Sequence, residues 1–230
     1  MMNDTALLRL LQLASPSLPI GAYSYSQGLE SAIDAGLVHD AASARAWIHA
    51  ALSEVLARFD APLQWRLLLA FAERDGAAIC AWSERWLAAR DTAELRAETI
   101  QMGYSLRQLL GALLDDVPEA DPRMLALLDA TALSLPAAYA CAAVALGVAP
   151  AAALLGALFS WVENQVLVCV KTVPLGQVAG QKMLLALAPS VEETARYAQA
   201  LPDRALSNWA PGLSLLSMRH EVQYSRLYRS

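Results

Sequence analysis

Apolar residues along this chain recur at the three- and four-residue spacing of a single helix face. The clearest case is the segment 40–58, where the apolar positions are Ala44, Trp47, Ile48, Ala51, Leu52 and Val55. Such spacing predicts amphipathic helices packed around a shared core. No alternation of period two persists long enough to predict a strand. The pattern therefore predicts an all-α, single-domain multi-helix bundle of about ten helices.

Proline, glycine and capping residues indicate where these helices begin and end. Asp40 is a good N-cap, and Asp60 followed by Pro62 starts another helix. Pro16 and Pro19 force an extended loop, because each removes a donor and restricts the residue before it. The helices are expected over residues 1–14, 24–35, 40–58, 60–76, 77–89, 92–114, 122–134, 136–147, 151–173, 175–187, 190–201 and 204–217.

One stretch raises the alternative of a membrane-embedded protein. Residues 130–162 contain no charged side chain, which is long enough to cross a bilayer. However, two prolines and two glycines divide the stretch into pieces of about a dozen residues, and alanine fills most of it. The pattern therefore favours buried bundle helices and no membrane partner.

Composition narrows the class of protein further. Hydrophobic residues make up 57% of the 230 positions, so the chain is too apolar to be disordered and can bury a sizeable core. The net charge is -5 and no basic block occurs, which gives no support for nucleic-acid binding. The cysteines Cys80, Cys141 and Cys169 are far apart and odd in number, so we expect no disulfide framework, no zinc site and a cytoplasmic location.

The C-terminal tail, residues 219–230, differs chemically from the body of the chain. It carries three arginines and one glutamate, interleaved with Tyr224, Leu227 and Tyr228. Arginine and rigid aromatic side chains are enriched at protein interfaces. We therefore divide the chain into a helical domain, 1–218, and a partner-docking tail, 219–230.

The search for catalytic motifs returns little. The segment 176–183 lacks the spacing and the hydroxyl residue of a phosphate-binding loop, and 21–28 departs from a nucleophile elbow. The three histidines have no metal-ligand spacing. We expect a non-enzymatic protein without a metal or cofactor of its own; the alternative is a small helical enzyme that uses Glu30, His220 and Glu221 as acid and base groups.

Three polar segments stand out in the apolar chain: 21–30, 163–171 and the tail. Polar groups buried in an apolar helix are costly unless they are paired. The side chains of 163–165 must therefore meet each other, water or a partner. Lys171 also has a simpler explanation, because a cation in the last turn of a helix interacts favourably with the helix dipole.

Together these segments resemble a known family. The motifs are LLQLASPSLPIG at 10–21, YSQGLE at 25–30, KTVPLGQ at 171–177, GQ at 180–181 and HEVQYSRLYRS at 220–230. In this order they resemble the urease accessory protein UreF family over essentially the whole chain. Tyr228 is a mild departure, because phenylalanine is expected there in many members.

The resemblance implies an all-α, homodimeric scaffold without chemistry of its own. Members join the accessory protein UreD, called UreH in some systems, and recruit the GTPase UreG onto apo-urease. The assembly delivers nickel and carbon dioxide to the urease active site, and the family protein couples the GTPase cycle to nickel release and forms part of a passage for nickel. Nickel is thus handled by the assembly.

The resemblance also implies roles for individual residues. Glu30 and Lys171 would lie on a surface that faces the GTPase or lines the passage, and Gln177 in the same motif as Lys171 would bind a partner. The tail residues that would bind partners are Arg219, His220, Glu221, Tyr224, Ser225, Arg226 and Arg229.

Overall fold

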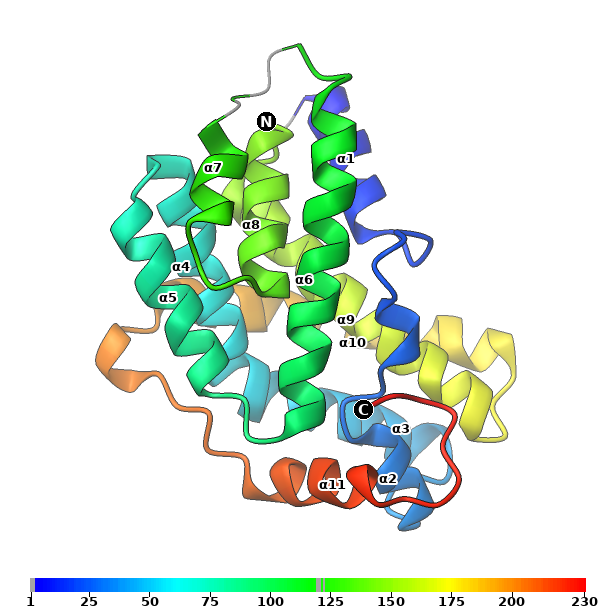
Figure 1. Ribbon diagram of the computed structural model, residues 1–230. Helices are drawn as coiled ribbons and strands as arrows, with labels where there is room; N and C mark the ends of the chain where they lie inside the picture. Colours follow the sequence, from blue (N-terminus) through cyan, green and yellow to red (C-terminus); the bar gives the residue numbers. More distant parts are fainter. Residues whose placement is uncertain (1–2, 119–120, 122) are drawn as a thin grey trace.

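The computed structural model describes residues 3–118, 121 and 123–230, and within them every regular element is helical (Figure 1). The elements are α1 (Asp4–Ala14), η1 (Ala22–Ser24), α2 (Leu29–Asp34), α3 (Ala41–Ala50), η2 (Ala51–Val55), η3 (Leu56–Arg58), α4 (Asp60–Glu73), α5 (Gly76–Ala88), α6 (Ala93–Leu114), α7 (Arg123–Asp129), α8 (Leu135–Ala145), α9 (Pro150–Thr172), α10 (Gln177–Ala200), η4 (Asp203–Ala205) and α11 (Pro211–Glu221). The prediction of an all-α bundle is confirmed.

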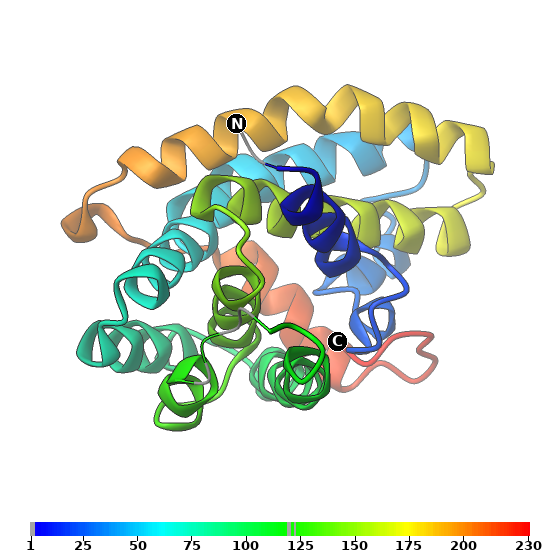
Figure 2. The same cartoon turned by 90° about the horizontal axis from the view of Figure 1, so that it is seen from above.

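Helix α8 forms the centre of the bundle. It packs against α4, α6, α7 and α9 (Figures 1 and 2). Nearly all of its side chains are buried. Its alanines have no polar atoms to satisfy and little volume, so neighbouring helices can surround it closely. The uncharged stretch thus forms a buried helix here, as predicted.

Helix α9 continues the same apolar stretch. By length and composition it could span a bilayer, but half of its most apolar window is buried inside the protein. Buried core helices meet the same criterion. Its buried face packs against α1, α4 and α10.

Several boundaries differ from the prediction made from local sequence. The helix expected over 24–35 is wrong: Gln27 and Gly28 have φ of 55° and 82°, so α2 begins at Leu29. The single helix expected over 40–58 is also wrong, because α3 gives way to a π-helical segment and then to a 3₁₀ turn. Its predicted N-cap is confirmed, since Asp40 and Ser43 form a capping box.

The break predicted between residues 187 and 190 is wrong as well. Pro189 lies inside the continuous helix α10. The carbonyl it leaves unpaired, four residues earlier at Leu185, lies on the exposed face, where water can reach it. Leu187 and Val191 are buried on the opposite face, and their packing maintains the helix.

Around α7 and α8 the differences are smaller. The helix expected over 122–134 is shorter, ending at Asp129; residue 122, its expected start, lies outside the described residues. The loop that follows packs closely on α6, where the Leu135 N–H donates to Thr99 Oγ1 at 3.2 Å.

The last predicted helix is displaced toward the C-terminus. The chain is extended over most of 201–210, and α11 begins at Pro211, where a proline fits the first turn. α11 ends at Glu221, not at residue 217, so the first three tail residues are helical. Beyond α11 the chain folds back to the start of α2 (Figure 1).

Gly103 on α6 lets the α7–α8 loop approach closely. A Cβ built on Gly103 would lie 2.6 Å from the Ser134 carbonyl carbon, and backbone cannot easily move away. We expect Gly103→Ala to lower the free energy of unfolding by about 2 kcal/mol or more. The matched control on the same helix is Gly111→Ala, where the nearest atom belongs to the flexible side chain of Arg107.

Urea denaturation of both variants tests this close approach. Gly111→Ala should be neutral or stabilising by up to about 1 kcal/mol, because alanine favours helices over glycine. Equal stability of the two variants would contradict the close approach.

Candidate docking site

The C-terminal tail is held in a polar surface formed by the start of α2 and the first turns of α6. We call this surface the tail seat; its residues are Ser24, Ser26, Gln27, Glu30, Glu94 and Glu98. The turn before α2, with two residues at positive φ, directs the N–H groups of Ser26 and Gln27 toward the end of the chain. α11 packs tightly above it, since a Cβ on Gly28 would lie 3.1 Å from Leu213 Cδ1.

Glu30 is the central acceptor of the tail seat. Its side chain is nearly buried, and its oxygens accept from the Leu227 N–H at 2.7 Å, the Tyr228 N–H at 3.0 Å and His220 Nε2 at 3.0 Å. A buried carboxylate is tolerated when it accepts several such hydrogen bonds. Glu30 therefore connects α2 both to α11 and to residues 227 and 228 of the tail.

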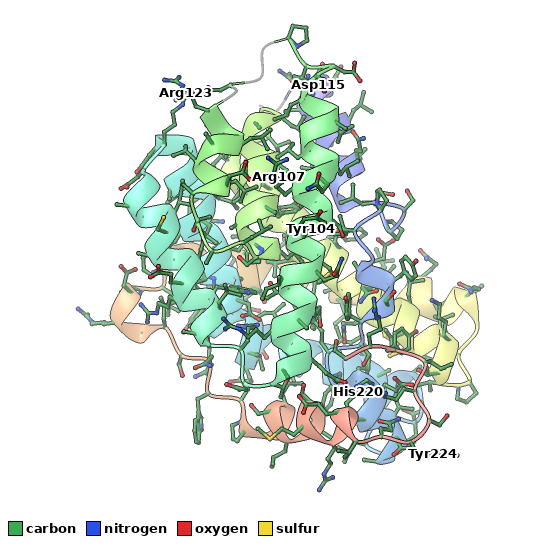
Figure 3. All side chains as sticks on the ribbon, in the orientation of Figure 1. Tyr104, Arg107, Asp115, Arg123, His220 and Tyr224 are labelled. Carbon is green, nitrogen blue, oxygen red and sulfur yellow. The ribbon has the colours of Figure 1, made fainter. Side chains whose placement is uncertain are left out.

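His220 links two carboxylates. It is fully buried, and its Nδ1 lies 2.7 Å from Glu94 Oε2 while Nε2 faces Glu30. The other Glu94 oxygen accepts from Arg226 at 2.6 Å. Each ring nitrogen of His220 therefore has a carboxylate oxygen as its hydrogen-bond partner. Figure 3 places His220 at the junction of α11 with α2.

The last residue is buried as completely as His220. The main-chain oxygen of Ser230 accepts from the N–H groups of Ser26 at 2.7 Å and Gln27 at 3.1 Å. Its hydroxyl donates to Glu98 at 2.6 Å, and the Arg229 N–H donates to the Ser24 carbonyl at 2.8 Å. The tail therefore ends in a closed set of hydrogen bonds.

Glu98 connects the tail seat to the interior. Its second oxygen accepts from Gln27, whose carbonyl in turn accepts from Trp161 Nε1 at 2.6 Å. Burial raises the pKa of Glu98 to about 7, although the hydrogen bonds from Ser230 and Gln27 and the charge of Arg90 oppose this shift. The protein thus holds a carboxyl group that changes its charge near neutral pH.

Tyr228 fills an apolar space beneath α9. Its ring is buried, with Lys171 Nζ 6.0 Å from the ring centroid, at the outer limit of a cation–π contact. Its hydroxyl is buried and makes no hydrogen bond with any residue the structure describes. The site thus holds the aromatic ring of Tyr228, whereas the hydroxyl adds no stabilising hydrogen bond.

The surface of α11 and the tail that points away from the seat is apolar. Leu215, Met218 and Val222 share one face of α11 by their spacing, and Tyr224 and Leu227 follow; all five are exposed. We call these five residues the outer face. Exposed apolar residues clustered in this way are typical of interaction surfaces.

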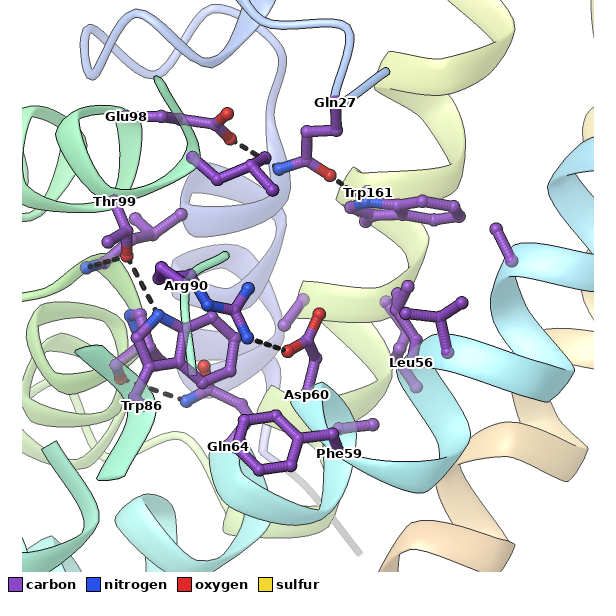
Figure 4. Close-up of a pocket in the computed structure, with 18 of the residues that line it drawn as sticks. Gln27, Leu56, Phe59, Asp60, Gln64, Trp86, Arg90, Glu98, Thr99 and Trp161 are labelled. Carbon is purple, nitrogen blue, oxygen red and sulfur yellow. Dashed lines mark hydrogen bonds and ion pairs between the residues drawn. The ribbon is translucent and has the colours of Figure 1, made fainter. Parts of the chain in front are cut away.

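A pocket of about 250 Å³ lies behind the tail seat (Figure 4). Its walls are mainly aromatic and aliphatic, including Trp86 and Trp161. Gln27 and Glu98 belong both to the pocket and to the seat, and the Asp60–Arg90 ion pair, at 2.7 Å, lies opposite them. The tail seat and the pocket therefore share one polar wall.

The structure brings half of the predicted site residues together, with different roles. Glu30, His220 and Arg226 belong to the polar network, and Glu221 accepts from the Ala93 N–H at 3.1 Å. Lys171 lies next to this network, because its Nζ is 6.0 Å from the centroid of the Tyr228 ring.

The remaining predicted residues lie at the surface. The side chains of Arg219, Tyr224 and Arg229 are exposed, and Ser225 accepts from the Gln223 amide through its carbonyl. Gln177 is exposed at the start of α10.

The sequence did not indicate that Glu94 and Glu98 on α6 accept hydrogen bonds from the tail. Nor did it indicate that the N–H groups of Ser26 and Gln27, in the turn before α2, donate to its last residue. Thr92 caps α6, as its side chain accepts from the Leu95 N–H, and this cap sets Glu94 in the first turn. That capping pattern was readable, but it gives no indication that Glu94 meets His220. The polar segment 163–165 contributes too: Asn164 donates to the Tyr25 carbonyl and Gln165 to that of Ser26.

The arrangement is unsuited to acid–base catalysis or metal binding at His220. Its two ring nitrogens are engaged by carboxylates on opposite sides, and the ring is inaccessible. Over the described part of the chain, no group of three or more His, Cys, Asp or Glu is placed to hold a metal ion. What the site can do is hold a peptide segment in place and display an apolar face.

These features define an all-α protein that holds its own C-terminal segment and exposes an apolar face, and its relatives show its family. A profile described as UreF matches residues 38–188. The chain is 66% identical over 230 residues to urease accessory protein UreF of Janthinobacterium sp. (strain Marseille), covering all of both chains. It is 58% identical to that of Nitrosospira multiformis over 98% of each chain, and 50% identical to that of Azoarcus sp. (strain BH72), over 97% of this chain and 95% of the relative.

The chain therefore belongs to the UreF family of urease accessory proteins. This membership supports a role in urease maturation. The resemblance stated from the motifs is confirmed. The profile covers neither the start of α2 nor the tail, whereas the full-length relatives cover both.

Glu98 should make stability depend on pH. Its pKa is raised in the folded state, so the folded protein holds the proton more tightly than the unfolded chain. Stability should therefore fall as pH rises from about 5 to 8, by roughly 3 kcal/mol from this group. Glu98→Gln should remove that fall, as measured by urea denaturation across this pH range.

The control is Glu192→Gln, on the exposed face of α10. Its stability should follow the pH profile of the unsubstituted protein. A Glu98→Gln profile parallel to that of the unsubstituted protein would show that Glu98 does not carry the buried proton.

Tyr228→Phe should preserve or raise stability, by up to about 1 kcal/mol, because it deletes a buried hydroxyl without a partner. The matched control is Tyr139→Phe, which loses a hydrogen bond to the Ala153 carbonyl at 3.0 Å and should be destabilising. Thermal unfolding of the two variants distinguishes them, and a clear loss of stability in Tyr228→Phe would contradict this description of the site.

Proposed function

We propose that this protein is a non-enzymatic scaffold of urease maturation that joins a UreD (UreH)-type accessory protein and a UreG-type GTPase on apo-urease. In this function it couples GTP-dependent nickel delivery to assembly of the urease active site. Nickel is the cargo of the assembly, and the chain supplies no cofactor. The observation that carries the proposal is the outer face, an apolar surface that lies over a buried polar network.

The tail residues divide into two groups under this proposal. His220, Glu221 and Arg226 act as positioning residues, since each binds a group within the chain. Tyr224 and Leu227 contact the partner, with Arg219 and Arg229 at the rim, where an acidic partner surface would complement them. Lys171 lies beside the Tyr228 ring, and Glu30 accepts from the main-chain N–H of Tyr228. Both residues therefore position this surface from inside the protein.

Other features support the remaining parts of the proposal. The three free thiols suit a cytoplasmic protein. Exposed leucines on α1, namely Leu7, Leu8 and Leu11, offer an apolar surface for the second copy of a homodimer. Carboxylate and amide groups in the pocket, including Asp60 and Gln64, support a passage for nickel.

The test is co-purification with the UreD-type and UreG-type partners. The double variant Tyr224→Ala with Leu227→Ala should lose the complex and keep its thermal stability, since both side chains are exposed. The matched control is Val178→Ala with Leu185→Ala, which removes equally exposed residues from α10. The control should retain the complex.

Urease activation in cells provides a second measurement and should fall in parallel with complex formation. If the tail variant retained the full complex, the proposal that the outer face binds the partner would be contradicted.

A further inference from the structure

Residues 227–230 lie in the tail seat in the manner of a bound peptide. Tyr228 and Ser230 are buried, whereas Leu227 and Arg229, between and beside them, are exposed. The backbone bends at residues 227 and 228. With this shape, the side chains of Tyr228 and Ser230 enter the seat, and those of Leu227 and Arg229 remain outside.

The seat recognises the main chain of this segment at four successive residues. The N–H groups of Leu227 and Tyr228 donate to the Glu30 carboxylate, and that of Arg229 donates to a carbonyl in the turn before α2. The Ser230 oxygen accepts from two N–H groups of the same turn. Peptide-binding sites combine main-chain hydrogen bonds, which give affinity, with pockets for alternate side chains, which give specificity.

Two side-chain contacts supply that specificity. The Tyr228 ring is buried beside Lys171, and the Ser230 hydroxyl donates to Glu98 at 2.6 Å. Since the Tyr228 hydroxyl has no recorded hydrogen bond, the site selects an aromatic ring of this size. The preferred ligand is therefore a peptide that contains an aromatic residue, any residue and serine in this order.

The link between α11 and this segment is exposed. Val222, Tyr224 and Ser225 are directed to solvent, and the segment 222–226 has no regular structure. Within this link, Gln223 accepts from Ser31 Oγ at 3.2 Å and Arg226 donates to Glu94 at 2.6 Å. The link also tethers residues 227–230 to α11, which raises the local concentration of the segment at its seat.

We propose that the tail seat is a peptide-binding site and that residues 227–230 are its intramolecular ligand, replaceable by the same segment supplied in trans. A second copy of this chain carries such a segment. The site would therefore allow two copies to exchange tails. This property goes beyond the scaffold function, and it is tested without any urease partner.

The probe is a fluorescent peptide of residues 223–230, and its binding to the full-length chain is measured by anisotropy. The variant Tyr228→Ala in the chain weakens the hold of its own tail, so it should bind the peptide at least about tenfold more tightly than the unsubstituted chain. The control is Leu227→Ala in the chain, which truncates an outward side chain and should bind as weakly as the unsubstituted chain.

Variants of the peptide test the contact made by the Tyr228 ring. In the peptide, Tyr228→Ala should weaken binding by about tenfold or more, whereas Tyr228→Phe and Leu227→Ala should leave it unchanged within about twofold. Arg229→Pro in the chain provides a second way to free the seat, because it deletes the donor to Ser24 and leaves the Tyr228 ring intact.

Absence of peptide binding to both chain variants, with helical circular dichroism intact, would overturn the proposal. So would equal binding of the Tyr228→Ala and unsubstituted peptides. Neither result would affect the scaffold function, which depends on the outer face and on partner co-purification.

Discussion

The C-terminal region of this protein depends on satisfying one buried carboxylate, that of Glu30. Its oxygens accept two main-chain N–H groups of the tail and one imidazole nitrogen of α11. A carboxylate removed from water without such donors would cost several kcal/mol, so α2, α11 and the tail are stable together. Glu94 and Glu98 extend the same constraint to α6, through His220 and Ser230.

This constraint gives α11 two different faces. The inner face carries Leu216, Ser217 and His220, all buried, whereas the outer face is apolar and exposed. In an isolated protein an exposed apolar face contacts only water. In an assembly such a face can form the apolar core of an interface with a partner. A UreF family member that works in urease maturation can therefore keep its polar contacts internal and present apolar ones.

Much of the helix content was predictable because it follows from local spacing and capping. α6 and α9 match their predicted ranges within a residue or two, and the Asp40 cap is present. The failures have tertiary causes. Pro189 is tolerated in α10 because it faces solvent, and residues 24–28 form a turn that receives the chain end instead of beginning a helix.

The sequence by itself determined the all-α class, the family and the unusual chemistry of the tail, because these follow from composition, spacing and motifs. Only the tertiary structure decided which tail residues face inward. His220 and Arg226 read as surface docking residues in sequence, yet their partners lie on α2 and α6, about 130 to 190 positions earlier. Hydrogen bonds between such distant residues leave no periodic pattern, so the division between anchoring and displayed side chains arises only when the chain end folds back onto α2.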